Sequence, residues 1–208
     1  MELSLDPQLF QMPPEPLKLH HTEQYTSQLL SKQLSAYFEL VPSCQPIVFV
    51  CIGTDRSTGD ALGPLVGSRL KKYNFSDIQL FGTLDEPVHA MNLKETLASI
   101  QEQYTLPYLV GIDACLGQLS SVGCIQLASG PLKPGAGVNK ELPPVGDIHM
   151  TGIVNVGGFM EYFVLQNTRL SLVMNMAEVI AKSIYISLLS TKRIASFSTN
   201  ASVTRLGQ

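Results

Sequence analysis

Six consecutive apolar residues, Ile47 to Ile52, stand out in the hydrophobic pattern because a polar, glycine-punctuated segment follows them directly. Most of the six are β-branched or aromatic, which favours a strand buried on both faces, and Gly53 ends the run. Proline is favoured at the first position of a helix, so a helix is predicted from about Pro64 to Lys72. This succession of buried strand, polar loop and helix is where α/β proteins usually keep their chemistry.

The same periodicity predicts further elements along the chain. Helices are expected over residues 22–40, 92–103, 159–166 and 177–189, and strands over residues 78–83, 109–114, 121–127 and 169–174. Residues 1–21 hold four prolines and no sustained period, and are predicted to form an irregular arm. Residues 129–155 read as a long irregular segment, which in a compact domain is either functional or disordered.

The order strand, helix, strand, helix, strand predicts an α/β protein with a parallel sheet and helices on both faces. With the common strand order 2-1-3-4, strands 47–52 and 109–114 are neighbours, and a crevice opens at their carboxyl ends. We divide the chain into an N-terminal arm and amphipathic helix (1–45), an α/β domain (46–190) and a flexible C-terminal tail (191–208).

Composition narrows the function classes. The 208 residues carry a net charge of −3 and no run of more than two neighbouring Lys or Arg residues, so nucleic-acid binding is not expected. The chain lacks 18 consecutive apolar residues, and its start lacks the basic and apolar regions of a signal peptide, so we expect a cytoplasmic protein without membrane partners.

Two aspartates are the candidate chemical groups. Asp60 lies in the polar loop, and Asp113 ends the apolar strand 109–114. Carboxylates brought together in a partly desolvated crevice either share a proton as an acid–base pair or bind a divalent metal. The alternative for Asp60 is a helix cap, and the alternative for Asp113 is a hydrogen-bond acceptor for the following loop.

No serine or cysteine nucleophile is assigned. Ser57 has no histidine base nearby in the sequence and no GxSxG turn, and Cys115 lacks a placed base. The other cysteines, Cys44, Cys51 and Cys124, show no CxxC spacing and are interpreted as small core residues. A nucleotide-binding module is a weaker alternative, because neither GxGxxG nor GxxxxGK[ST] is present.

Three segments in order carry a family resemblance: Gly53 to Pro64, Gly111 to Ala114 and Pro134 to Leu142. Together they resemble the spore germination protease pattern, and residues 45–190 resemble the YyaC-type sporulation proteases. Both groups are similar in fold to the hydrogenase maturation endopeptidases. The resemblance implies a three-layer α/β/α, phosphorylase/hydrolase-like fold in which Asp60 and Asp113 match the two essential acidic positions.

In the hydrogenase maturation relatives, the matching acidic residues and a histidine after the fourth strand hold a metal. The resemblance therefore implies a divalent metal held by Asp60, Asp113 and His149, with a loop histidine that has no ligand role as the alternative for His149. The germination protease carries an extra region for which this chain has no room, and the N-terminal arm matches nothing in the maturation enzymes. Substrate specificity therefore does not carry over.

The sequence thus predicts a sporulation-associated endopeptidase in the cytoplasm of a spore-forming cell or forespore, acting on a protein or peptide through Asp60 and Asp113. The expected substrate-binding residues are Thr54, Asp55, Ser57, Gly135, Gly137 and Asn139. The alternative is a noncatalytic sporulation protein that keeps the fold and holds a peptide or metal. The oligomeric state is open, with a homo-oligomer among the partners considered.

Overall fold

A computed structural model describes residues 14–73, 75, 78–135 and 142–194. Its described part contains one six-stranded sheet with the order β1-β5-β6-β4-β2-β3. The strands are β1 (Leu17–His20), β2 (Ile47–Cys51), β3 (Ile78–Phe81), β4 (Tyr108–Gly117), β5 (Cys124–Ser129) and β6 (Ile148–Val156). Strands β3, β2, β4 and β6 run parallel, whereas β5 is antiparallel to both of its neighbours, β6 and β1. The predicted α/β class with a mainly parallel sheet is confirmed.

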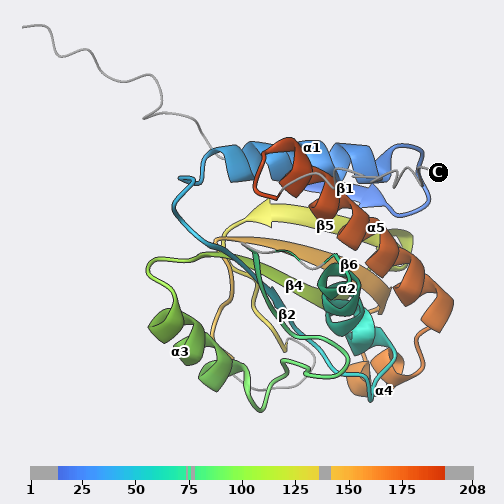
Figure 1. The fold of residues 1–208 in the computed structure, drawn as a ribbon. Coiled ribbons are helices and arrows are strands. Elements are labelled where there is room, and N and C mark those ends of the chain that lie inside the picture. Colours follow the sequence, from blue (N-terminus) through green and yellow to red (C-terminus); the bar gives the residue numbers. More distant parts are fainter. Residues whose placement is uncertain (1–13, 74, 76–77, 136–141, 195–208) are drawn as a thin grey trace, which may run out of the picture.

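Helices cover both faces of the sheet, which gives three layers (Figure 1). On one face lie α1 (Thr26–Glu39), α2 (Leu62–Lys71) and α5 (Leu170–Ser190), and on the other lies α3 (Leu93–Gln103). The short helix α4 (Glu161–Gln166) lies at the end of the sheet, and single 3-10 turns are formed by η2 (Gly59–Ala61) and η3 (Leu119–Ser121).

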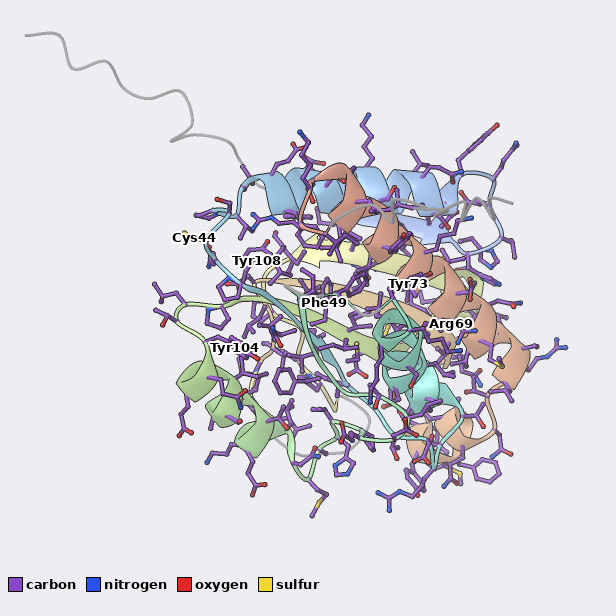
Figure 2. The ribbon with its side chains drawn as sticks, viewed as in Figure 1. Cys44, Phe49, Arg69, Tyr73, Tyr104 and Tyr108 are labelled. Atoms are coloured by element: carbon purple, nitrogen blue, oxygen red, sulfur yellow. The ribbon has the colours of Figure 1, made fainter. Side chains whose placement is uncertain are left out.

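Strand β2 lies between β4 and the edge strand β3, and it is buried at every position, as its two-sided apolar pattern predicts. Phe49 points into the interior of the protein (Figure 2) and packs edge-to-face on Phe38 of α1, with 6.3 Å between the ring centroids. Val48 and Val50 belong to the smaller core under α3, which they share with Leu93 and other residues of that layer. Side chains that alternate along β2 therefore pack in the larger core on one face of the sheet and in the smaller core on the other.

The strand predicted over residues 169–174 is wrong, because residues 170–174 form the start of α5. The buried positions Val173, Met176, Ala177 and Ile180 follow the i, i+3, i+4, i+7 spacing of one helical face. That spacing continues without a break into the predicted helix 177–189. Packing against α1 and α2 therefore extends a single helix over the whole segment.

The irregular segment predicted over residues 129–155 is also wrong at its end, because residues 148–156 form β6. Ile148 and Met150 point into the larger core, while His149 and Thr151 alternate with them toward the other face. Strand β6 inserts between β4 and β5, so the predicted strand order holds only for β3, β2 and β4.

The N-terminal arm contains a strand that its prolines concealed. Residues Leu17 to His20 pair with β5 at the edge of the sheet. Residues 1–13 and 195–208, which include most of the predicted tail, lie outside the described residues. The proposed domain boundaries remain a prediction.

Helix α5 is long and apolar enough to cross a membrane by length and composition alone. Half of its most apolar 18-residue stretch is nevertheless buried inside the protein. Its buried face packs in the core with residues of α1 and α2, and Glu178 on its exposed side accepts a hydrogen bond from Arg69 Nε of α2 at 2.8 Å. These contacts are those of a core helix.

Candidate functional site

A cavity of about 520 Å³ opens at the carboxyl ends of β2 and β4, on the side of the sheet that faces α3. Asp60 and Asp113 both line it. Its roof comes from the segment after β5, where Leu132 packs over Gly111 so closely that a Cβ on Gly111 would lie 2.6 Å from a Leu132 methyl group. The crevice expected at the ends of two neighbouring strands is present.

Asp113 lies inside β4 rather than at the end of a strand, which corrects the sequence-based expectation. Strand β4 continues to Gly117 because its pairing with β6 extends that far, whereas β2 stops opposite Ile112. Val110 and Ile112 face the larger core, so Asp113 points to the opposite face and into the cavity.

The environment of Asp113 favours its protonated form. Burial raises the pKa of this carboxyl group to about 8, and the negative charge of Asp60 adds to the rise. The backbone N–H of Ala114 donates a hydrogen bond to Asp113 Oδ1 at 2.8 Å, and this bond opposes the rise in pKa. Asp113 is therefore largely a neutral carboxylic acid at pH 7.

Asp60 is held by a loop that folds back on itself. Its backbone carbonyl accepts a hydrogen bond from Thr54 N at 3.1 Å. A Cβ on Gly53, whose φ is +146°, would lie 1.9 Å from that same carbonyl oxygen, so only glycine allows this approach. The Asp60 side chain caps neither η2 nor α2, and the capping interpretation is therefore wrong.

Burial also raises the pKa of Asp60, and the nearby Ser57 hydroxyl opposes this rise. The side chain of Ser57 is buried, and its Oγ makes no full hydrogen bond within the described part of the chain. Ser57 does not line the cavity, and its effect is on the pKa of Asp60.

The remaining predicted substrate-binding residues divide into three groups. Thr54 and Gly135 line the cavity with the aspartates. Asp55 is exposed and lies outside the lining. Gly137 and Asn139 lie outside the described residues.

His149 lines the cavity, and its Nδ1 is 2.7 Å from the carbonyl oxygen of Gly130. Within the described residues, however, no three His, Cys, Asp or Glu side chains come together in a group that could hold a metal ion. Asp60, Asp113 and His149 therefore share one cavity without forming a three-ligand metal site in this arrangement.

The structure adds lining residues that sequence reasoning missed. Thr151 of β6 is paired in register with Asp113, and Tyr162 and Leu165 of α4 form part of the wall. The period-2 alternation of residues 148–151 was the available signal for Thr151. Cys115 also lines the cavity, but burial raises the pKa of its thiol, which disfavours the reactive thiolate.

A search of solved structures finds a [NiFe] hydrogenase maturation protease HycI from Thermococcus kodakarensis KOD1, with a TM-score of 0.47 and 21% identity. The match covers 73% of this chain and 98% of that one. At this TM-score and identity the likeness indicates neither an activity nor a substrate for this chain.

Two sequence comparisons give the relationship. The chain is 60% identical over 140 residues to the uncharacterized protein YyaC of Bacillus subtilis (strain 168), a match that covers 67% of this chain and 68% of that protein. Residues 18–183 match the family described as a protein of unknown function, DUF1256. That match spans most of the sequence, and the chain therefore belongs to the DUF1256 family.

Proposed function

We propose that this protein is an endopeptidase that hydrolyses a peptide bond with the carboxyl groups of Asp60 and Asp113. One observation carries the proposal: two carboxyl groups line one cavity, and the environment of Asp113 raises its pKa to about 8. Two neighbouring carboxyl groups, one of which is held as the neutral acid near pH 7, are suited to opposite roles in acid–base catalysis.

Ionised Asp60 is the general base and protonated Asp113 is the general acid. Asp60 takes a proton from water as the water oxygen attacks the carbonyl carbon of the scissile amide. Asp113 donates its proton to the amide nitrogen as the C–N bond breaks, so that the amine leaves uncharged. Exchange of one proton with solvent then restores both groups.

No step is routed through a metal, because the described residues do not assemble three ligands for one. Calorimetric titration with Zn²⁺ tests the metal expectation without an activity assay. Binding that weakens as the carboxylates protonate and also falls in His149→Ala would support a metal site. Binding that His149→Ala leaves unchanged would remove this histidine from the site.

The resemblance to the germination protease pattern extends the proposal to a protein substrate in the cytoplasm of a spore-forming cell. Small acid-soluble spore proteins are the first substrates to test. With one of them as substrate, Asp60→Asn and Asp113→Asn should each lower cleavage by about 10²-fold or more, because each amide keeps the shape but cannot transfer the proton. The matched control is Asp85→Asn, which changes an exposed aspartate outside the cavity.

Thermal unfolding of each variant separates lost chemistry from lost folding. The proposal is contradicted if wild-type protein cleaves none of the candidate substrates at any pH while the two variants lose only affinity for peptides. That outcome would favour the noncatalytic peptide-binding alternative.

The pH dependence of cleavage gives a second test. The rate should fall on the alkaline side as Asp113 ionises near pH 8, and on the acidic side as Asp60 becomes protonated. Ser57→Ala should move the acidic limb to higher pH, because the Ser57 hydroxyl holds the pKa of Asp60 down. An acidic limb that does not move would exclude this role for Ser57.

A further inference from the structure

Apolar side chains gather on the surface around α4, at the rim of the cavity. Phe159 is 90% exposed, Tyr162 60%, Met160 59% and Phe163 57%. We call these four residues the α4 apolar surface. Single exposed apolar residues are ordinary, but a group of large ones within five positions marks an interaction site.

The backbone that carries this surface has an unusual conformation, which local hydrogen bonds fix. Met160 adopts a left-handed conformation with φ of 57°, and the preceding Gly158 has φ of 142°. Glu161 Oε1 accepts a hydrogen bond from Gly158 N at 3.2 Å, and Phe163 N donates to the Met160 carbonyl at 2.9 Å. A bulky residue at positive φ is strained and persists only where the surroundings impose it.

The underside of the segment is anchored to the sheet. The side-chain Nδ2 of Asn155, in β6, donates to the Val164 carbonyl oxygen at 3.3 Å and to the Thr168 hydroxyl at 3.2 Å. Gly59 approaches Leu165 so closely that a Cβ there would lie 2.8 Å from a Leu165 methyl group. The aromatic side chains above are therefore presented on a fixed support rather than used in the core.

The α4 apolar surface continues into the cavity. Tyr162 belongs to both, and beyond it Leu165 and Leu116 line the wall up to the strand that carries Asp113. Across the cavity, the roof residues Leu132 and Pro134 are apolar as well. A polypeptide bound beside Asp113 and leaving the cavity on this side would pass directly over the aromatic side chains.

We propose that the α4 apolar surface binds an apolar segment of the polypeptide substrate, next to the bond held at Asp60 and Asp113. The inference rests on the proposed function, because it takes the bound molecule to be the peptide substrate. Its substrate class is a flexible chain with large aliphatic or aromatic side chains flanking the cleaved bond. A cavity of about 520 Å³ lies within the usual range for ligand sites, and the exposed surface extends the binding area beyond it.

The test measures binding, so that it does not depend on turnover. Two fluorescein-labelled 12-residue peptides are compared, one with three central Leu or Phe residues and one with Ser or Asn in their place. Fluorescence anisotropy is measured with Asp113→Asn protein and with the same protein carrying Phe159→Ser and Phe163→Ser. Both phenylalanines are more than half exposed and outside the buried core, and thermal unfolding checks that the fold is kept.

The apolar peptide should bind about tenfold or more tightly than the polar one, and the double substitution should remove that difference. The matched control is Leu106→Ser, at an 80% exposed leucine outside the cavity lining, which should change nothing. Equal binding of the two peptides, or an unchanged preference in the double variant, would overturn the proposal.

Two further results would also overturn it. If sedimentation shows a dimer that the double substitution dissociates, the surface binds a second copy. If phosphatidylglycerol vesicles bind the protein and displace the apolar peptide, it binds a membrane. Failure of catalysis remains distinguishable, because a protein that cleaves nothing but keeps the peptide preference contradicts the proposed function alone.

Discussion

The chemistry of Asp113 depends on what surrounds it. The residue sits in the middle of β4 at the level where β2 has already ended, so one side of it opens on the cavity while β6 covers the other. Few polar groups compensate its charge: the Ala114 N–H donates to it, whereas the Asp60 charge repels it. A carboxyl group in such a place is stabilised as the neutral acid.

The stability of Asp113→Asn should depend on pH. The folded-state pKa of Asp113, about 8, lies above its ordinary value of 3.8. Protonated Asp113 therefore makes its full contribution to the free energy of unfolding below about pH 4. That contribution is lost as the pH rises toward 8, because Asp113 ionises in the unfolded chain at a lower pH than in the folded protein. Asn has no such loss and can still accept the Ala114 hydrogen bond.

The Tm of Asp113→Asn relative to wild type should therefore rise between pH 4 and pH 8 and level off above pH 8, with each kcal/mol giving about 2–4 °C at this chain length. Differential scanning calorimetry across this range measures it, with Asp85→Asn as the control. A difference that stays constant across the range would show that Asp113 is not buried as its raised pKa requires.

At the scale of elements, the site depends on the close approach of α2 to the ends of β2 and β3. A Cβ on Gly63 would lie 2.1 Å from the Ile52 carbonyl oxygen, and one on Gly67 would lie 1.9 Å from the Gly82 carbonyl oxygen. Both obstacles are backbone atoms that cannot rotate away. These glycines therefore set the position of η2 and of Asp60 within it.

Gly63→Ala should destabilise the protein by about 1–3 kcal/mol, because the added methyl group forces the start of α2 away from β2. The sign is informative, since helix propensity alone predicts that alanine stabilises an α-helix over glycine. Urea unfolding measures the change, with Lys71→Ala at the exposed end of the same helix expected within about 0.5 kcal/mol of wild type. A stabilised Gly63→Ala variant would contradict the close approach.

At the scale of the whole molecule, the N-terminal elements are part of the main core. Leu30, Leu34 and Phe38 of α1 are fully buried and share the larger core with α2, α5 and the sheet. Arg193, just after α5, donates to the carbonyl oxygens of Phe38, Val41 and Pro42, and so ties the end of α1 to the end of α5.

Leu34→Ala should therefore lower the stability of the entire domain by about 2–5 kcal/mol rather than melt α1 alone. Urea unfolding followed by far-UV and near-UV circular dichroism should show one transition that shifts as a whole. Lys32→Ala, at an exposed position of the same helix, is the control. A separate early transition in Leu34→Ala would show that residues 1–45 fold independently.

The sequence alone predicts the elements whose signal is local. Burial of Ile47 to Ile52 on both faces follows from an unbroken apolar run that is mostly β-branched. The helix predicted from Pro64 is present but begins two residues earlier, at Leu62, because the first turn of a helix tolerates proline. The sequence also predicts that Asp60 and Asp113 share a crevice, because the carboxyl ends of neighbouring parallel strands meet at one edge of a sheet.

Features that depend on pairing between distant segments could not be predicted from the sequence. Strand β6 forms by pairing with β4 on one side and β5 on the other. Its pairing with β4 extends β4 beyond the end of β2, covers one side of Asp113 and places Thr151 opposite it. Residues 170–174 became helical because α1 and α2 offer a surface for a helical face. The raised pKa of Asp113 and the joining of α4 to the cavity have the same origin, since burial is set by residues far away in the sequence.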